Sequence, residues 1–411
     1  MKNSPVFFSD LRSDTKRAVL DKISELLEMV EIGNKIKAND LVAIKLHFGE
    51  RGNTAFVRPI FIRRIVNTVK TFGGKPFLTD TNTLYPGTRA ESISHITTAI
   101  QNGFDYSTVD APVIIADGIR GSASVKVRID KPIYPEVSIA RDIFTADCII
   151  GIAHFTGHEL SGVGGALKNL AMGCSSREGK LKQHSSVAPR VKTARCTGCG
   201  TCVEWCPHGA ISILNDKARI DPEPCIGCGE CLAVCPEGAI QVQWDNNAVL
   251  FQKKMAEYAY GALVGKREKS IFLNFLTQVS PTCDCYGHSD APIVGDIGFL
   301  SSCDPVAVDQ ASIDLVNEQS GNERSGLKAH LGPGRIHFEV CKPKSTGGSN
   351  CDMLGKSTWD RENTISSRSE KYPRPQRAFF SPKKILILTT RGEMIILIPY
   401  FLTTTMGTCP I

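Results

Sequence analysis

The sequence contains no long uninterrupted apolar run and no amino-terminal secretion signal. Its nearest candidate for a membrane span, residues 385–402, is interrupted by Arg391 and Glu393, whereas a membrane helix needs about 20 consecutive apolar residues. No stretch near the amino terminus has the apolar core of a signal peptide. We therefore expect no membrane span and a cytoplasmic location, where cysteine thiols remain reduced.

The main part of the sequence also lacks a basic face, although the net charge is +6. Residues 321–411 carry 14 Lys and Arg against 7 Asp and Glu, which leaves 34 against 35 in the preceding 320 residues. The surplus positive charge belongs to the last part of the chain, and nucleic acid is not an expected partner. Because that part is rich in Ser, Lys, Arg, Gly and Pro, we interpret 321–411 as an atypical basic tail whose composition favours disorder.

Cysteine, by contrast, is abundant, and eight of the 16 cysteines form two matched sets. The segments CTGCGTCVEWCP and CIGCGECLAVCP both follow the pattern C-x2-C-x2-C-x3-C-P. The first set is Cys196, Cys199, Cys202 and Cys206, and the second is Cys225, Cys228, Cys231 and Cys235. Each cysteine has a counterpart 29 positions on, as expected for a duplicated unit. This spacing is typical of bacterial ferredoxins with two clusters and predicts two 4Fe–4S clusters as cofactors.

In such ferredoxins the last cysteine of each set binds the cluster of the other set. We therefore assign one cluster to Cys196, Cys199, Cys202 and Cys235, and the second to Cys225, Cys228, Cys231 and Cys206. Zinc is the main alternative, but structural zinc sites usually take two separated C-x2-C pairs. Disulfides are the least favoured assignment, because the chain is not a short secreted scaffold.

On both sides of the cysteine sets, helix-like and strand-like segments alternate. Helical periodicity predicts helices over 14–30, 57–72, 88–102 and 255–263, and another that Asp304 begins. Apolar runs predict strands over 41–48, 76–79, 113–116, 125–129, 148–153 and 271–279. The alternation predicts an α/β fold with a mostly parallel sheet. We expect a discontinuous α/β domain over 1–189 and 246–320, interrupted by a small α+β ferredoxin module of the bacterial 2x[4Fe-4S] type over 190–245.

Five segments carry a resemblance to a known family. They are KLHFGE (45–50), HFTGHELSGVGGALKNLAMGC (154–174), GKLKQH (179–184), CDC (283–285) and DIGFLSSCDPVAVDQASIDLVN (296–317). Over roughly residues 1–320 the chain resembles the Domain of Unknown Function 362 family, in the form that carries an inserted 4Fe–4S ferredoxin module. The resemblance implies an iron–sulfur protein with an α/β body. The tail departs from the family, whose members end in an ordered aromatic-rich segment that this sequence does not show after Glu318.

Polar residues follow three of the expected strands at the ends where parallel sheets gather ligands. The cluster at the end of the first strand is Lys45, His47 and Glu50, that of the second is Asp80 and Asn82, and that of the third is His154, His158 and Glu159. We expect these residues to converge on one cleft. The catalytic candidates are Lys45, His47, Asp80, His154, His158 and Lys168. The two histidines have a spacing found in metal sites, but Gly157 favours a loop in which both are solvated or hydrogen-bonded.

Two further features near this cleft have alternative interpretations. The turn Gly162-Val163-Gly164-Gly165 precedes an expected helix with Lys168, and it either binds an anion or lets the helix pack closely on the sheet. Cys148 and Cys303 are interpreted as buried apolar side chains. The triplet Cys283-Asp284-Cys285 is a candidate metal or redox site. We place this additional site at His154, His158, Cys283 and Cys285.

The leading hypothesis for function is an iron–sulfur oxidoreductase. A ferredoxin-like donor or another oxidoreductase would deliver single electrons to the clusters, which would pass them to a substrate or metal in the α/β cleft. The alternative is a non-catalytic, ferredoxin-like electron carrier that docks between redox partners. Clusters that only stabilise the fold are the least favoured hypothesis, because the duplicated set is typical of electron carriers.

Overall fold

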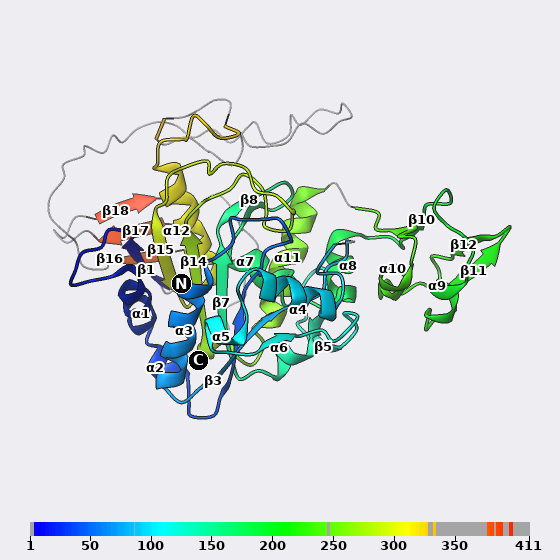
Figure 1. Cartoon of the computed structure of the whole chain (residues 1–411), viewed down its shortest axis with the longest axis horizontal. Helices are drawn as coiled ribbons and strands as arrows, with labels where there is room; N and C mark the ends of the chain where they lie inside the picture. Colours follow the sequence, from blue (N-terminus) through cyan, green and yellow to red (C-terminus); the bar gives the residue numbers. More distant parts are fainter. Residues whose placement is uncertain are drawn as a thin grey trace.

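A ten-stranded sheet forms the centre of the molecule, with the strand order β18-β17-β16-β1-β15-β14-β7-β2-β3-β4 (Figure 1). The computed structural model describes residues 4–85, 87–244, 247–327, 332–333, 376–381, 384–388 and 394–397. The strands are β1 Ser4–Asp10, β2 Leu41–Lys45, β3 Lys75–Asp80, β4 Val113–Ile115, β7 Cys148–His154, β14 Ser270–Leu276, β15 Gly298–Ser302, β16 Gln376–Ser381, β17 Lys384–Leu388 and β18 Met394–Leu397. Most of the expected tail lies outside the described residues, and β16 to β18 extend the sheet beyond β1.

The sheet is mixed, and its central block is parallel. Strands β14, β7, β2, β3 and β4 run parallel to one another, as the α/β pattern predicts. From β14 through β15 to β1 the pairing is antiparallel, so the parallel central block continues into an antiparallel side. A parallel pair needs a crossover connection, usually a helix, and no helix lies between β14 and β15.

Helices cover both faces of the sheet, and the strand residues alternate between the two cores. In β2, Val42 and Ile44 belong to the core under α1 (Val19–Met29) and α3 (Pro59–Thr71). Ala43 belongs to the opposite core, which α7 (Ala166–Ala171), α11 (Ala248–Ala262) and α12 (Pro305–Asn317) cover. The remaining helices outside the cysteine region are α2 Ile32–Lys35, α4 Ser92–Gln101, α5 Tyr106–Val109, α6 Arg141–Thr145, α8 Arg177–His184 and a 3-10 helix at Arg267–Lys269.

The helices predicted from periodicity are present, with shorter bounds in most cases. Helix α1 begins at Val19 rather than at residue 14, because Asp14 closes a turn by accepting hydrogen bonds from the backbone of Lys16 (2.7 Å) and Arg17 (3.0 Å). Helix α12 begins after Asp304, which accepts hydrogen bonds from the backbone of Val306 and Ala307, as a residue of the N-cap type does.

Two small β pairs flank the main sheet. The segment expected as a strand over 125–129 is β5 (Ser124–Arg128), but it pairs with β6 (Glu136–Ala140) in a separate ribbon. It is therefore not a strand of the central sheet, and only Val127 in it is buried. The second pair is β8 (Thr156–His158) with β9 (Gly162–Gly164), a hairpin just before α7.

The cysteine region over 190–244 contributes no strand to the central sheet, whereas strands from both sides of it do. It contains the pairs β10–β13 and β11–β12 and two short helices, and Figure 1 shows it projecting from the side of the body near α8. Its elements are β10 Arg190–Val191, α9 Thr201–Glu204, β11 Ile211–Leu214, β12 Lys217–Ile220, α10 Glu230–Val234 and β13 Ile240–Gln241. None of the helices in the described part of the chain has the length and apolarity to cross a membrane.

Candidate functional site

The eight cysteines of the duplicated motif line two hollows, and each hollow takes three cysteines from one half and one from the other. The first, which we call hollow I, encloses about 330 Å³ and is lined by Cys196, Cys199, Cys202 and Cys235. The second, hollow II, encloses about 360 Å³ and is lined by Cys225, Cys228, Cys231 and Cys206. These are the two groups of four that the ferredoxin spacing assigns to separate clusters.

The backbone around both hollows directs N–H groups toward sulfur. Ala218 donates to the Cys196 sulfur (3.3 Å), Ala239 to Cys235 (3.2 Å) and Ala210 to Cys206 (3.2 Å). Hydrogen bonds of this kind stabilise thiolates that bind iron. Residues that turn the loops, such as Gly198 (φ +71°) and Gly227 (φ +72°), have left-handed backbone conformations that glycine adopts without strain.

The spacing of the eight sulfur atoms argues against single zinc ions. A tetrahedral zinc site with Zn–S bonds of about 2.3 Å places its sulfurs roughly 3.8 Å apart. In the described part of the chain, the one group of three ligand atoms within 4.8 Å of one another is His158, Cys283 and Cys285. Among the described residues, the sulfurs around hollows I and II therefore do not form a three-ligand group of the size that one zinc ion needs.

Hollow II lies against the α/β body through helix α8. A Cβ atom on Gly229, which lines this hollow, would be 3.1 Å from Arg177 Cγ. Leu232 packs on an apolar cluster that contains Leu181 and Leu84. In Figure 1, helix α9, which carries Cys202 of hollow I, lies farther from α8 than α10 does, and Cys199 of hollow I is exposed. The two hollows therefore differ in their surroundings: hollow II contacts α8, and hollow I includes an exposed cysteine.

Arg177 and Lys180 connect α8 to the loop that follows β3. Arg177 is buried and donates to the carbonyl oxygens of Thr83 (2.7 Å) and Ala90 (2.6 Å). Lys180 donates to Ser175 O (2.8 Å) and to the Thr81 hydroxyl. Burial lowers the pKa of Lys180 to about 8. A positively charged helix face thus lies between hollow II and the carboxyl ends of the parallel strands.

Lys45 and Asp80 form a buried ion pair at the ends of β2 and β3. Their charged atoms are 3.0 Å apart, and Lys45 also donates to Asn169 Oδ1 at 2.7 Å. Burial alone would raise the pKa of Asp80, but Lys45 and the neighbouring His95 hold it below its usual range. Arg89 lies 3.5 Å from Asp80 and bonds Glu50 at 3.1 Å. The charged groups of this network pair with one another and hold the ends of β2 and β3 in place.

His47 offers a hydrogen-bond donor that the protein does not use. Its Nδ1 accepts from Gly49 N at 2.9 Å, whereas its buried Nε2 has no partner. Burial and the positive charges of Arg89, Lys168 and Lys45 lower the pKa of His47, so the ring is neutral. Because Nδ1 accepts, the proton is on Nε2.

The two histidines with metal-ligand spacing have different environments, and neither fits the expected metal site well. His154 Nδ1 lies 2.8 Å from Asp284 and its Nε2 lies 2.8 Å from Thr277 O, so no ring nitrogen remains for a metal. This corrects the expectation for His154. His158 ends strand β8, and its Nδ1 accepts from the backbone N–H groups of Leu160 (3.2 Å) and Ser161 (3.1 Å). Its nitrogen lone pair is therefore already engaged.

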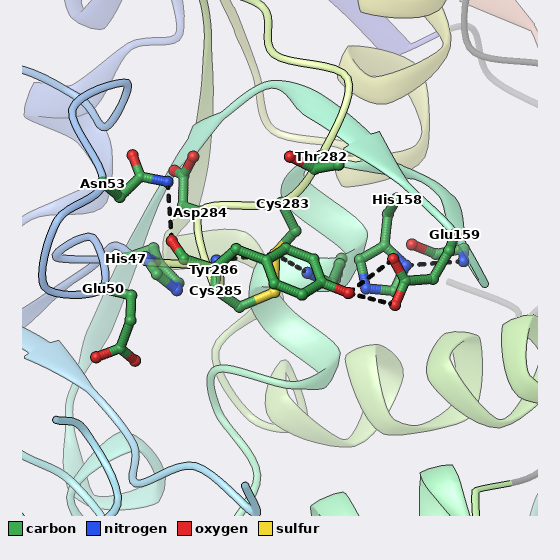
Figure 2. The surroundings of a disulfide bond; sticks show 12 residues. His47, Glu50, Asn53, His158, Glu159, Thr282, Cys283, Asp284, Cys285 and Tyr286 are labelled. Atoms are coloured by element: carbon green, nitrogen blue, oxygen red, sulfur yellow. Dashed lines mark hydrogen bonds between the residues drawn. A yellow bond between two sulfur atoms is a disulfide. The ribbon is translucent and has the colours of Figure 1, made fainter. Parts of the chain in front are cut away.

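Cys283 and Cys285 form a disulfide near His47 and His158 (Figure 2). Cys283 is buried and its sulfur lies 2.9 Å from Lys168 Nζ, whereas Cys285 is half-buried. Burial lowers the pKa of Lys168 to about 8. In Figure 2, His158 and Glu159 lie on one side of the disulfide and His47 and Glu50 on the other. Lys168 is thus a catalytic candidate that directly contacts a sulfur atom of the disulfide.

The start of α7 already holds a carboxylate from the protein itself. Asp309 accepts from the backbone of Ala166 (2.6 Å) and Leu167 (2.9 Å), and a Cβ on Gly165 would lie 2.2 Å from its Oδ1. A carboxylate of helix α12 thus occupies the backbone N–H groups that the anion-binding interpretation assigned to an external ligand. Burial raises the pKa of Asp309 to about 6.

Several residues of the site were not among the catalytic or binding candidates that the sequence pattern named. Asp117 accepts from the Asn82 side chain at 2.9 Å, and burial raises its pKa to about 6. Arg89, Asp117, Asn169, Arg177, Lys180 and Asp309 come from loops and helices distant in sequence, and no local spacing relates them to the strand ends. Of the cysteines expected to be buried, Cys148 is buried and Cys303 is half-buried.

Comparison with known proteins gives one family. A family model described as domain of unknown function (DUF362) matches residues 42–314. No curated protein matches the chain. The lactate racemase apoprotein from Thermoanaerobacterium thermosaccharolyticum superposes with a TM-score of 0.37 at 10% identity, over 72% of this chain and 56% of that one. A Thermotoga maritima protein from the Northeast Structural Genomics Consortium gives 0.36 and 13%, over 72% and 58%. The chain thus spans little more than half of either structure, and likenesses at these scores carry no argument about activity.

Proposed function

Because this chain belongs to the DUF362 family, whose description assigns no function, we propose its function from the two hollows and the cleft. Hollows I and II each hold one 4Fe–4S cluster, and the protein transfers single electrons to a substrate or metal site in the α/β domain. The clusters supply the one-electron redox chemistry when they are bound. The protein is then an iron–sulfur oxidoreductase that a redox partner supplies with electrons.

The observation that carries this proposal is the crossed grouping of the cysteines. Each hollow combines three cysteines of one half with the last cysteine of the other half, as bacterial two-cluster ferredoxins require. Backbone N–H groups point to three of the eight sulfur atoms. Apolar side chains such as Ile211, Ala218 and Ile240 fill the space around the cysteines, and this shields the site from water.

Because hollows I and II have different surroundings, we assign a direction to the electron transfer. Hollow I has the exposed Cys199 and is lined by the exposed side chain of Ile213, so a partner protein can approach it. Hollow II contacts α8, whose Lys180 bonds Thr81 beside Asp80. We therefore assign electron entry to hollow I and delivery to the body to hollow II.

The residues of the cleft form two groups, which differ in whether the side chain is already engaged in a buried ion pair. Lys45, Asp80 and His154 are engaged in buried ion pairs and position the others. His47 presents an unused N–H, and Lys168 has an ammonium group whose pKa is near 8. In the proposed reaction His47 orients the acceptor, and Lys168 holds or donates a proton.

Anaerobic reconstitution with variants at the ligands tests the proposal. The wild type should contain about eight irons per chain and give an EPR signal when reduced. Under the crossed assignment, Cys196→Ser with Cys235→Ser should leave one intact cluster of about four irons, whereas Cys196→Ser with Cys206→Ser should disturb both. Cys303→Ser, outside the hollows, is the control. A colourless protein with two zinc ions per chain would refute the proposal.

A further inference from the structure

We propose that Cys283 and Cys285 are a dithiol–disulfide redox couple that collects two electrons in the cleft. This inference rests on the proposed function, because hollows I and II are the source of the electrons. It names the first acceptor in the α/β domain and assigns the proton transfer to Lys168. Cys285 is the sulfur that exchanges with a disulfide-containing substrate.

The position of the disulfide suits reactivity better than stabilisation. The bond closes a loop between residues two positions apart, and a loop this short removes little entropy from the unfolded chain. The loop is already fixed by other contacts: Asn53 donates to the carbonyl oxygens of Tyr286 (3.2 Å) and His288 (3.3 Å), and Glu50 N donates to Asp284 O (3.1 Å). The disulfide is therefore not needed to hold the loop.

The two sulfur atoms have different environments. Cys283 is buried beside the Lys168 ammonium, with 2.9 Å between Sγ and Nζ. An adjacent cation stabilises a thiolate. Cys285 is half-buried and is the sulfur that an incoming molecule can reach. The pair thus has one sulfur stabilised by charge and one accessible for exchange, as thiol–disulfide chemistry requires.

The reaction balances with the components that the proposal names. A one-electron donor supplies two electrons in succession through the hollows, and the S–S bond breaks. Cys283 takes a proton from Lys168 Nζ and Cys285 takes one from water, which gives two thiols. Lys168 then regains its proton from solvent. In the return step, Cys285 attacks an external disulfide, Cys283 displaces the mixed disulfide, and the substrate leaves as two thiols.

A chain of contacts joins hollow II to this pair. Gly229 packs on Arg177, and Lys180 of the same helix bonds Thr81, which follows Asp80. Asp80 pairs with Lys45, and Lys45 bonds Asn169, the neighbour of Lys168. The disulfide therefore lies at the end of a continuous buried network that begins at hollow II.

A metal ion is the competing occupant, because His158, Cys283 and Cys285 lie within 4.8 Å of one another. Two observations favour the redox couple. His158 Nδ1 is engaged by two backbone N–H groups, and an ammonium 2.9 Å from Cys283 repels a cation. We therefore treat metal binding as an outcome of the test.

The test follows the thiols themselves rather than turnover. The reconstituted full-length chain is oxidised with a small disulfide and then reduced with a viologen radical. Mass spectrometry after alkylation counts the free thiols in the peptide that contains residues 283–285. We expect none after oxidation and two after reduction, and we expect the reduction to be lost when a chelator has removed the iron. Oxidised chain that still alkylates at both positions would overturn the inference.

Variants of Lys168 and Cys285 separate the assigned roles. Lys168→Arg keeps the charge but holds its proton too tightly to donate it, so reduction should slow by about a hundredfold, the usual contribution of a general acid. Cys285→Ser should abolish reaction of the reduced chain with a chromogenic aromatic disulfide. Equal rates for Lys168→Arg and wild type would remove Lys168 from the mechanism.

Two other results would each refute a different statement. If iron loads normally but the viologen reduces the disulfide equally fast with and without iron, the couple is not fed by the hollows and this inference fails while the proposed function stands. If no iron loads, both fail together. One zinc ion per chain that is lost in Cys283→Ser would identify a metal site and overturn the redox couple.

Discussion

The contact between His154 and Asp284 shows how a single buried pair makes the stability of the protein depend on pH. The ring nitrogen lies 2.8 Å from the carboxylate, and both side chains are buried. Burial alone would lower the pKa of His154, but Asp284 more than offsets this effect, so the pKa is raised. A raised folded pKa means that the pair stabilises the protein fully below about pH 6.5, the unfolded value. That stability is lost as the pH rises through the raised value.

Asp284→Asn should therefore destabilise the protein in a pH-dependent way. Removing one partner of a buried pair costs about 3 kcal/mol or more, and we expect this loss at about pH 6. The difference from wild type should shrink as the pH rises through the raised pKa of His154, because the ring then becomes neutral in both proteins. Chemical denaturation at a series of pH values from about 6 upward measures it. Asp296→Asn, which removes the charge of an exposed carboxylate that accepts from Gln278 N, is the control and should show no such trend. An unchanged difference at high pH would contradict the assignment.

For individual residues, the sequence predicts those site residues that lie at the ends of parallel strands, but it does not predict those that other elements bring to the site. Lys45 and Asp80 are predictable because they end neighbouring parallel strands, and such ends meet at one edge. Arg89 and Asp309 are not, because a loop and a helix bring them in from positions that no periodicity relates to the strands. His154 has the spacing of a ligand, but only the fold reveals that Asp284 and Thr277 occupy both nitrogens.

The contact between helix α7 and strand β2 depends on a glycine at the helix end. A Cβ on Gly173 would lie 2.1 Å from Lys45 Cε and 2.5 Å from Asn169 O. The second contact is with backbone, which cannot move aside without distorting α7. Gly173→Ala should destabilise the protein by about 1–3 kcal/mol, as overpacking does, and displace Lys45 from Asp80.

Thermal or denaturant unfolding measures this effect, and a second glycine provides the control. A Cβ on Gly295 would meet no atom within 4 Å, so Gly295→Ala should change the free energy of unfolding by less than about 1 kcal/mol. If both variants behave alike, the close approach of α7 to Lys45 does not determine the packing of this element.

Elements with a clear period could be predicted, whereas those set by tertiary pairing could not. Helix α3 buries Ile62, Ile65, Val66 and Val69 at helical spacing, and its bounds follow from that pattern. Strand β15 contains only five residues, GFLSS, and its polar Ser301 and Ser302 are buried by pairing between β14 and β1. Strand β5 has a strand-like sequence, but its alternation does not reveal that its partner is β6.

At the scale of the whole molecule, the central sheet and the cysteine region have separate sources of stability. Strands β2, β7 and β14 lie between two apolar cores that residues outside 190–244 supply. Within the cysteine region, the apolar cluster contains few fully buried side chains, among them Cys202 and Cys231. Under the proposed function, bound metal supplies most of the folding energy of that region, as in small metal-binding domains.

Removal of the iron should therefore unfold one part of the chain and leave the other. We expect amide hydrogen exchange to lose its protection over 190–244 in the chelated protein, while β2, β7 and β14 keep theirs. Leu232 of the cysteine region contacts Leu181 of α8 and Leu84. Because α8 is the nearest element of the body, we expect it to lose some protection, and we expect the loss to extend no farther into the body. Exchange that spreads evenly into β14 would show that the sheet depends on the cysteine region for its stability, and unchanged protection throughout would show that the cysteine region folds without metal.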